Sequence, residues 1–111
     1  RLYLEQQGFE VMNVNGELSA SQAGNQGINN QEPEKIVEFA SKVCHPDADV
    51  LFCSCTAWRS MEAAHELEQL TGKPVITSNQ TTIWTALRKV GLYQSIQGFG
   101  KLLENLGEGP K

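Results

Sequence analysis

Short apolar runs alternate with helix-length amphipathic segments along this chain, and this alternation limits the folds that it can adopt. Residues 50–53 form a continuous apolar run, which is typical of a strand buried on both faces of a parallel sheet. Residues 75–77 form a second short run, and residues 9–14 alternate apolar with polar positions as a further strand would. Because helical patterns separate these runs, the order predicts βαβ units with right-handed crossovers in an α/β fold.

Helix signals lie between and after the predicted strands. Pro33 and Glu34 are typical of a first helical turn, and Ser78 or Asn79 is expected to cap a later helix. Residues 1–8 have the pattern of the end of a helix that stops at a glycine. The main helices are expected within residues 33–43, 58–70 and 78–90, and a last segment, residues 98–106, has apolar residues on one side.

The size and composition predict a single globular domain over residues 1–111. Hydrophobic residues make up 40% of the chain and charged residues 20%, as in chains that bury a core. A net charge of −4 without a basic stripe argues against nucleic acid as a partner, and no apolar run is long enough for a membrane span. The three cysteines are too few for a disulfide framework, so we expect a cytoplasmic location.

Three polar segments follow the ends of the predicted strands. Residues 15–32 form a loop rich in Asn, Gln, Ser and Gly, and its length is unusual for a connection in a compact domain. Residues 54–57 and 77–80 form two shorter turns. In open α/β sheets, ligands bind beyond the carboxyl ends of the strands. We therefore expect the three segments to meet at one rim, with 15–32 as an active-site loop.

Cys55 is the strongest chemical candidate in the chain. It lies in a polar turn directly after an apolar run, and a helical pattern opens after that turn. A helix N-terminus favours negative charge, so this position would favour a thiolate and would also hold a substrate carboxylate. A small buried structural cysteine is the competing interpretation. The hydroxyls of Ser54 and Thr56 on either side favour a functional role, whereas Cys53 and Cys44 are expected to be structural.

A metal site is the next alternative, and its candidate ligands are Cys44, His45, Cys53, Cys55 and His65. Their spacing matches no zinc template, and the chain has no Cys-x-x-Cys pair that would indicate a thiol redox protein. The sequence also has no Walker motif and no dinucleotide fingerprint. We therefore expect neither a metal nor an organic cofactor.

Five segments in order along the chain carry a family resemblance. They are Leu4-Glu-Gln-Gln-Gly-Phe-Glu-Val11, Asn25-Gln-Gly-Ile28, Asp47-Ala-Asp-Val-Leu-Phe-Cys-Ser-Cys-Thr56, Leu70-Thr-Gly-Lys-Pro-Val-Ile-Thr-Ser-Asn-Gln80 and Gly98-Phe-Gly-Lys-Leu-Leu103. Together they resemble the second half of the aspartate/glutamate racemase superfamily. The branch that they resemble most contains maleate cis-trans isomerase, arylmalonate decarboxylase and ectoine-utilisation relatives. The Ser-Cys-Thr-x-x-Arg and Pro-Val-x-x-Ser-Asn-Gln turns are the most specific parts.

The resemblance implies a fold of two flavodoxin-like halves that face each other across a cleft, each with one cysteine at a strand end. In that arrangement Cys55 is the second cysteine of the pair. Asn25 is the loop residue that binds a substrate carboxylate, and Thr56 belongs to the anion site. Ser54 and Asn79 are further carboxylate-binding candidates on neighbouring turns.

The resemblance also implies cofactor-independent chemistry on a small carboxylate or dicarboxylate. A thiolate either removes a proton beside the carboxylate or adds to a double bond, and a thiol returns a proton. The family's first half, with its cysteine, and the strand expected before Arg1 are absent from this sequence. We therefore expect the C-terminal half of a cysteine-dependent isomerase or racemase, inactive alone. It would form a homo-oligomer or associate with an N-terminal half. The alternative is a non-catalytic domain that binds carboxylates or associates with itself.

Overall fold

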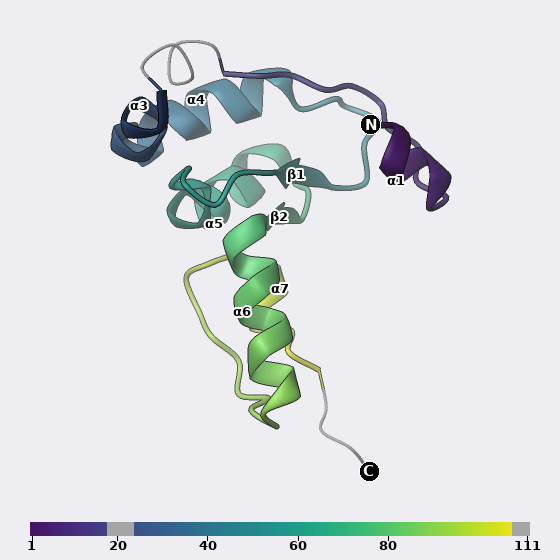
Figure 1. The fold of residues 1–111 in the computed structure, drawn as a ribbon, viewed down its shortest axis with the longest axis vertical. Coiled ribbons are helices and arrows are strands. Elements are labelled where there is room, and N and C mark those ends of the chain that lie inside the picture. The colour runs from purple at the N-terminus through teal and green to yellow at the C-terminus, as the bar shows by residue number, and fades with distance from the viewer. Residues whose placement is uncertain (18–23, 108–111) are drawn as a thin grey trace.

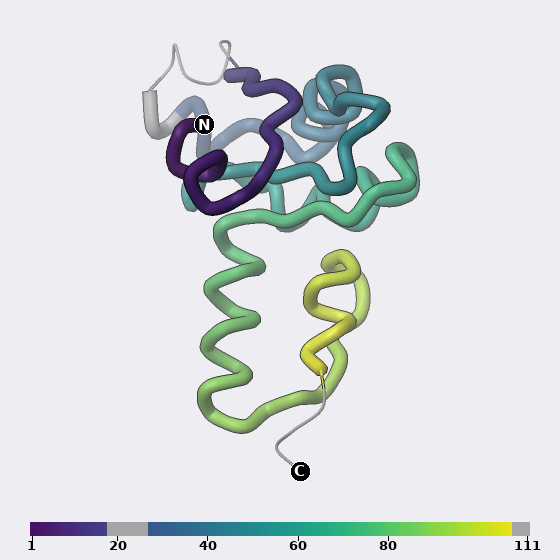
Figure 2. Tube along the Cα trace, turned by 90° about the vertical axis from the view of Figure 1, so that its right-hand side faces the viewer, coloured from purple at the N-terminus to yellow at the C-terminus, as the bar shows by residue number. Residues whose placement is uncertain are grey.

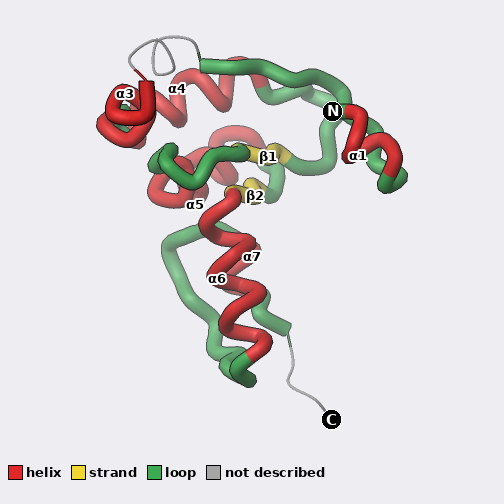
Figure 3. Tube along the Cα trace, in the orientation of Figure 1, coloured by secondary structure: helices red, strands yellow, loops and turns green. Residues whose placement is uncertain are grey.

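The computed structural model describes residues 1–17 and 24–107, and a short parallel sheet lies at its centre (Figures 1 and 3). The two strands are joined by a helix that packs against the second strand, as the predicted βαβ unit requires. The α/β class and the parallel pairing expected from the sequence are therefore confirmed. In chain order the elements are α1 (Leu2–Gln6), α3 (Gly24–Asn30), α4 (Pro33–Val43), β1 (Leu51–Cys53), α5 (Ser60–Thr71), β2 (Val75–Thr77), α6 (Ser78–Lys89) and α7 (Lys101–Glu104).

Local sequence signals explain where the longer helices begin and end. Pro33 occupies the first turn of α4, where its missing N–H costs no helical hydrogen bond. Helix α5 ends at Gly72, whose φ of 70° lies in the left-handed region that glycine adopts without strain. Thr77 caps α6, one residue before the predicted Ser78 or Asn79, because its hydroxyl accepts from the Gln80 N–H.

The main core lies between α4, α5 and the sheet. Helix α4 packs on α5, and α5 packs on β2. Leu51 and Trp58 pack against this cluster from the edge. Burying such a cluster removes apolar surface from water, which is the main source of stability for a domain of this size. The buried members are Ile36, Val37, Ala40, Cys53, Ala63, Ala64, Leu67 and Val75.

Helices α6 and α7 form a second body on the other side of the sheet, where they lie side by side (Figure 2). Leu103 and Leu106 are buried there. The guanidinium of Arg88 lies 5.0 Å from the ring centre of Trp84 and 5.2 Å from that of Tyr93, so it is held between two aromatic rings. Within the described ranges, no helix is long and apolar enough to cross a membrane.

The sequence predictions for residues 9–14, for the 15–32 loop and for strand β1 are wrong in the described residues. Residues 9–14 form no strand, and Phe9 is 63% exposed, because no neighbouring strand pairs with this segment within the described ranges. The predicted 15–32 loop contains helix α3. Strand β1 is not buried on both faces, since Phe52 is 49% exposed. Residues 18–23 of that loop lie outside the described part of the chain.

Candidate active site

The cysteine turn, residues 54–59, joins the carboxyl end of β1 to α5. Cys55 is half-buried in this turn, and Ser54 and Thr56 are exposed on either side of it. Helix α5 begins at Ser60, so the helix does not open directly after Cys55 as the sequence predicted. The side chain of Trp58 packs against the core just before the helix starts.

The N-terminus of α5 has no side-chain cap. Its N-cap residue is Arg59, and among the described residues no side chain caps the first helical N–H groups, although the Glu62 N–H donates to the Arg59 carbonyl over 3.2 Å. The first N–H groups of any helix lack partners within the helix, and together with the helix dipole they favour an anion. The described structure therefore places an uncapped helix N-terminus at the end of the turn that carries Cys55.

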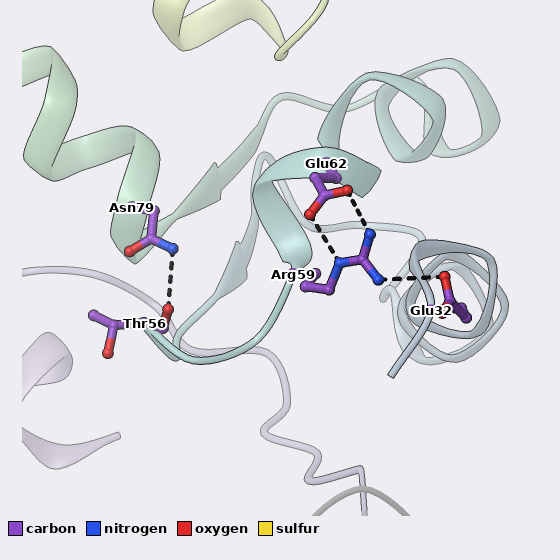
Figure 4. A network of polar contacts seen from close by, with 5 residues as sticks. All are labelled: Glu32, Thr56, Arg59, Glu62 and Asn79. Atoms are coloured by element: carbon purple, nitrogen blue, oxygen red, sulfur yellow. Dashed lines mark hydrogen bonds and ion pairs between the residues drawn. The ribbon is translucent and has the colours of Figure 1, made fainter. Parts of the chain in front are cut away.

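Asn79 connects the two predicted turns. Its side-chain Nδ2 donates to the backbone carbonyl of Thr56 over 3.1 Å (Figure 4). Asn79 belongs to the first turn of α6, so this bond brings the start of α6 against the cysteine turn. The predicted convergence of these two turns is confirmed. The bond engages one amide hydrogen of Asn79 with the backbone, which makes this residue a support of the turn.

Arg59 is a functional candidate that the sequence prediction did not include among the site residues. Its Nε and Nη2 donate to the two carboxylate oxygens of Glu62, each over 2.9 Å, and its Nη1 donates to Glu32 over 3.2 Å (Figure 4). These bonds raise the pKa of Arg59, and they lower the pKa of Glu62 from its ordinary 4.5. The contact with Glu32 ties the end of the cysteine turn to the N-cap of α4. The spacing of three residues between Arg59 and Glu62 was the available sequence signal.

An open cavity of about 530 Å³ lies beside this ion-pair network. Amide and charged side chains line it, so it is suited to a polar ligand rather than an apolar one. The lining residues are Asn29, Asn30, Glu32, Arg59 and Glu62.

Cys53 is buried in the core as the sequence predicted, whereas Cys44 is only half-buried. Cys53 is 4% exposed in the core, and burial, with a smaller contribution from Cys44, raises the pKa of its thiol from 9.0 to about 11. The thiol of Cys44 is half-buried at the end of α4, with its Sγ 3.9 Å from the carbonyl oxygen of His45. All three cysteines are free.

The candidate metal ligands are not brought together. The Nδ1 of His45 accepts from the Asp47 N–H over 3.1 Å, while His65 is exposed and lies 3.1 Å from the side chain of Gln69. Among the described residues, no three His, Cys, Asp or Glu side chains are placed to hold a metal ion. Asn25, the predicted carboxylate ligand, lies in α3, and its side chain is outside the described part of the structure.

Comparisons with known proteins relate this arrangement to enzymes. A family model described as arylmalonate decarboxylase matches residues 1–103. The maleate isomerase of Alcaligenes faecalis is 25% identical over 105 residues, which are 94% of this chain and 40% of that enzyme. This chain thus spans about two fifths of the length of that curated relative.

Solved structures agree with the family match. The maleate isomerase of Pseudomonas putida S16, crystallised with maleate as a cysteine-to-alanine variant, has 26% identity and a TM-score of 0.66, over 73% of this chain and 33% of its own. A variant of arylmalonate decarboxylase has a TM-score of 0.71 over 94% of this chain and 45% of its own, and its 20% identity supports the fold alone. Because the family model covers almost all of its residues, the chain belongs to the arylmalonate decarboxylase family, within the aspartate/glutamate racemase superfamily.

Proposed function

We propose that this chain supplies the second-cysteine half of a cofactor-independent isomerase that acts on a small dicarboxylate such as maleate, with Cys55 as the reacting group. The observation that carries the proposal is the placement of Cys55, half-buried in the turn between a strand end and an uncapped helix N-terminus. Two relatives, at 25% and 26% identity, are maleate isomerases, and one was crystallised with maleate. That crystal structure carries a cysteine-to-alanine substitution, which supports a role for a cysteine.

The proposed reaction needs only a thiolate and an anion site. The thiolate adds to one carbon of the cis double bond, and the electron pair of that bond moves toward the adjacent carboxylate. Rotation then occurs about the resulting single bond. Return of the electron pair expels the thiolate and leaves the trans product, so no proton or electron is gained or lost overall. Donors aimed at the carboxylate oxygens stabilise the charge that develops there.

The carboxylate ligands proposed for this step lie on the cysteine turn and on α3. Ser54 and Thr56 provide exposed hydroxyls next to Cys55, and the first N–H groups of α5 provide further donors. Asn25 is the proposed donor from α3. The main role proposed for Asn79 is to support the turn through its bond to Thr56, and direct binding of the substrate is a secondary role. A reducing, cytoplasmic location would keep the three free thiols available for such chemistry.

A decarboxylase is the second candidate, since the family model that matches the chain is that of arylmalonate decarboxylase. In this reaction the bond to one carboxylate breaks, CO₂ leaves, and the electron pair stays on the substrate carbon. The Cys55 thiol then gives its proton to that carbon. The same turn would serve both reactions, and only the substrate differs.

Substitution of Cys55 tests the proposal, and Cys44 offers a matched control because it is also free and half-buried. Maleate and an arylmalonate are incubated with the intact protein, and product is followed by proton NMR. We expect Cys55→Ala to lower turnover by at least about 100-fold, while Cys44→Ala leaves it within about twofold. Equal turnover above the background rate in Cys55→Ala and the unsubstituted protein would overturn the role of Cys55. Product from maleate supports the isomerase, and product only from the arylmalonate supports the decarboxylase.

A non-catalytic, self-associating domain is the remaining alternative, and the exposed apolar side chains favour it. Phe9, Val14 and Phe52 are 63%, 66% and 49% exposed. Apolar side chains exposed to this degree are often covered by another surface. Sedimentation velocity of the 111-residue chain over a concentration series tests this reading. Concentration-dependent association without turnover of either substrate would favour it over the enzyme.

A further inference from the structure

Gln31 makes a pair of contacts that links the cysteine turn to the segment before α4. Its Oε1 accepts from the indole N–H of Trp58 over 2.6 Å. Its Nε2 donates to the carboxylate of Glu17. Gln31 lies near the end of the 15–32 segment. It therefore connects Glu17, at the start of the same segment, with Trp58 in the cysteine turn.

Both residues of the bond between Trp58 and Gln31 are held by the surrounding structure. Trp58 packs against the main core and meets the ring of Phe39 edge-on, with ring centres 6.3 Å apart. Gln31 directly follows α3, which ends at Asn30, and directly precedes Glu32, the N-cap of α4. A shift of the cysteine turn relative to the junction of α3 and α4 would therefore strain or break the bond between Gln31 and Trp58.

The neighbouring residues repeat the same link. Glu32 accepts from Arg59 over 3.2 Å, so the consecutive residues Gln31 and Glu32 hold the consecutive residues Trp58 and Arg59. The two bonds differ in solvent exposure and in the expected contribution to stability. The ion pair is exposed, with Arg59 and Glu32 side chains 34% and 68% accessible, whereas the bond between Trp58 and Gln31 is partly buried. Exposed ion pairs contribute little, and a partly buried neutral bond is costlier to lose.

We propose that Gln31 is a positioning residue, which holds the Cys55 turn in register with α3 through its bond to Trp58. This inference rests on the proposed function of Cys55, because it assigns the bond to the same site. Helix α3 carries Asn25 and the turn carries Cys55, so a rigid link between them fixes the spacing of a carboxylate donor and the reacting thiol. Productive geometry in such sites tolerates displacements of only a fraction of an ångström.

The test compares two variants that remove the same bond from opposite sides. Trp58→Phe keeps the aromatic contact with Phe39 and loses the N–H donor. Gln31→Leu keeps the side-chain size and loses the acceptor for Trp58, together with the donor to Glu17. Trp84→Phe is the matched control, because the indole N–H of Trp84 donates to the Asn105 carbonyl over 3.1 Å in the α6–α7 body.

The readout is the rate at which iodoacetamide labels each cysteine, measured peptide by peptide by mass spectrometry. We expect Trp58→Phe and Gln31→Leu each to speed labelling of Cys55 by between about threefold and tenfold, the range for loss of one neutral hydrogen bond. Labelling of Cys44 and Cys53 should stay within about twofold, and Trp84→Phe should change none of the three. The double variant should behave like Gln31→Leu alone, because that variant has already lost the bond to Trp58.

Two results would overturn the proposal. An unchanged Cys55 rate in both variants would show that the bond does not hold the turn. A parallel rise at all three cysteines would show a general loss of stability, which is a structural role only. Labelling needs no turnover, so this test still decides the role of Gln31 if Cys55→Ala retains activity. Where turnover of maleate is measurable, a larger effect on KM than on kcat would further support the spacing role, because the link then acts on carboxylate binding.

Discussion

The two strand–helix junctions of this protein begin alike and end differently. Cys53 and Thr77 are opposite each other in the parallel ladder, and both are buried at the ends of their strands. After Thr77 the helix starts at once, and Thr77 itself is the cap. After Cys53 the chain makes the cysteine turn, residues 54–59, and α5 then starts without a side-chain cap.

The difference separates a structural junction from a chemical one. At the start of α6, the Gln80 N–H donates to the Thr77 hydroxyl over 3.1 Å, and the Gln80 Oε1 accepts from the Thr77 N–H over 2.8 Å. These bonds engage the Thr77 N–H, the Gln80 N–H and the Gln80 side chain inside the protein. At the start of α5 the Glu62 N–H donates to the Arg59 carbonyl over 3.2 Å. Among the described residues, no side chain caps the N–H groups of Ser60 and Met61, which leaves these two for an anion.

The largest expected effect comes from breaking the capped junction. Gln80 is fully buried, and its Nε2 also donates to the carbonyl of Phe99, so it joins β2, α6 and the segment before α7. Gln80→Ala leaves buried groups unpaired and opens a cavity, and we expect the free energy of unfolding to fall by about 3 kcal/mol. Urea unfolding followed by circular dichroism measures the change.

The exposed Gln97 provides the control for that substitution, since its side chain bonds only to the Ser95 hydroxyl among the described contacts. Gln97→Ala should stay within about 0.5 kcal/mol of the unsubstituted protein. Equal losses in the two variants would mean that the capped junction is no more important to stability than the surface.

The second-largest expected effect concerns Cys53, which occupies in β1 the position that Thr77 occupies in β2. Burial raises the pKa of Cys53 from 9.0 to about 11, so between these values the unfolded chain loses the thiol proton while the folded chain keeps it. The free energy of unfolding therefore falls as pH rises through this window, by about 2–3 kcal/mol in all. Below pH 9.0 the contribution is fully present.

Cys53→Ala isolates this effect, because alanine does not titrate. We expect urea midpoints measured under reducing conditions to fall more steeply between about pH 9 and pH 11 in the unsubstituted protein than in Cys53→Ala. Parallel pH curves for the two proteins would show that the Cys53 thiol is not the buried acid.

The sequence predicted the parts of this comparison that are local. The pairing of β1 with β2, the main helices and the burial of Cys53 follow from apolar patterns and from the spacing of strands and helices. The cap was predicted one residue late, although Thr77 and Gln80 already have the spacing of a capping box.

The rest depended on partners that are distant in the sequence. Residues 9–14 have a strand pattern, but a strand forms only where a neighbour pairs with it, and the pattern does not report the neighbour. Helix α3 contains two glycines and three asparagines, which are poor helix formers, so propensity gave no signal for it. The bonds from Gln31 to Trp58 and from Glu32 to Arg59 each span 27 residues, and no local spacing indicates them.

The smallest expected effect on stability comes from removing the Asn79 side chain, whose bond to Thr56 connects the two junctions. Asn79→Ala removes the bond to the Thr56 carbonyl, and we expect it to lower the free energy of unfolding by only about 1 kcal/mol. Its effect on the site should be clearer. Labelling of Cys55 by iodoacetamide should be faster by a factor of about three to ten, because the turn loses its support from α6.

Asn105 gives a matched comparison, since its Nδ2 also donates to a backbone carbonyl, that of Lys101, over 2.8 Å in α7. Asn105→Ala should cost a similar free energy of unfolding and leave the Cys55 rate unchanged. If both variants change Cys55 equally, the turn responds to global stability. If only Asn79→Ala changes it, the capped junction acts as a rigid support for the uncapped one. In that case the α6 junction has a structural role, and the α5 junction is the one that carries the reacting cysteine.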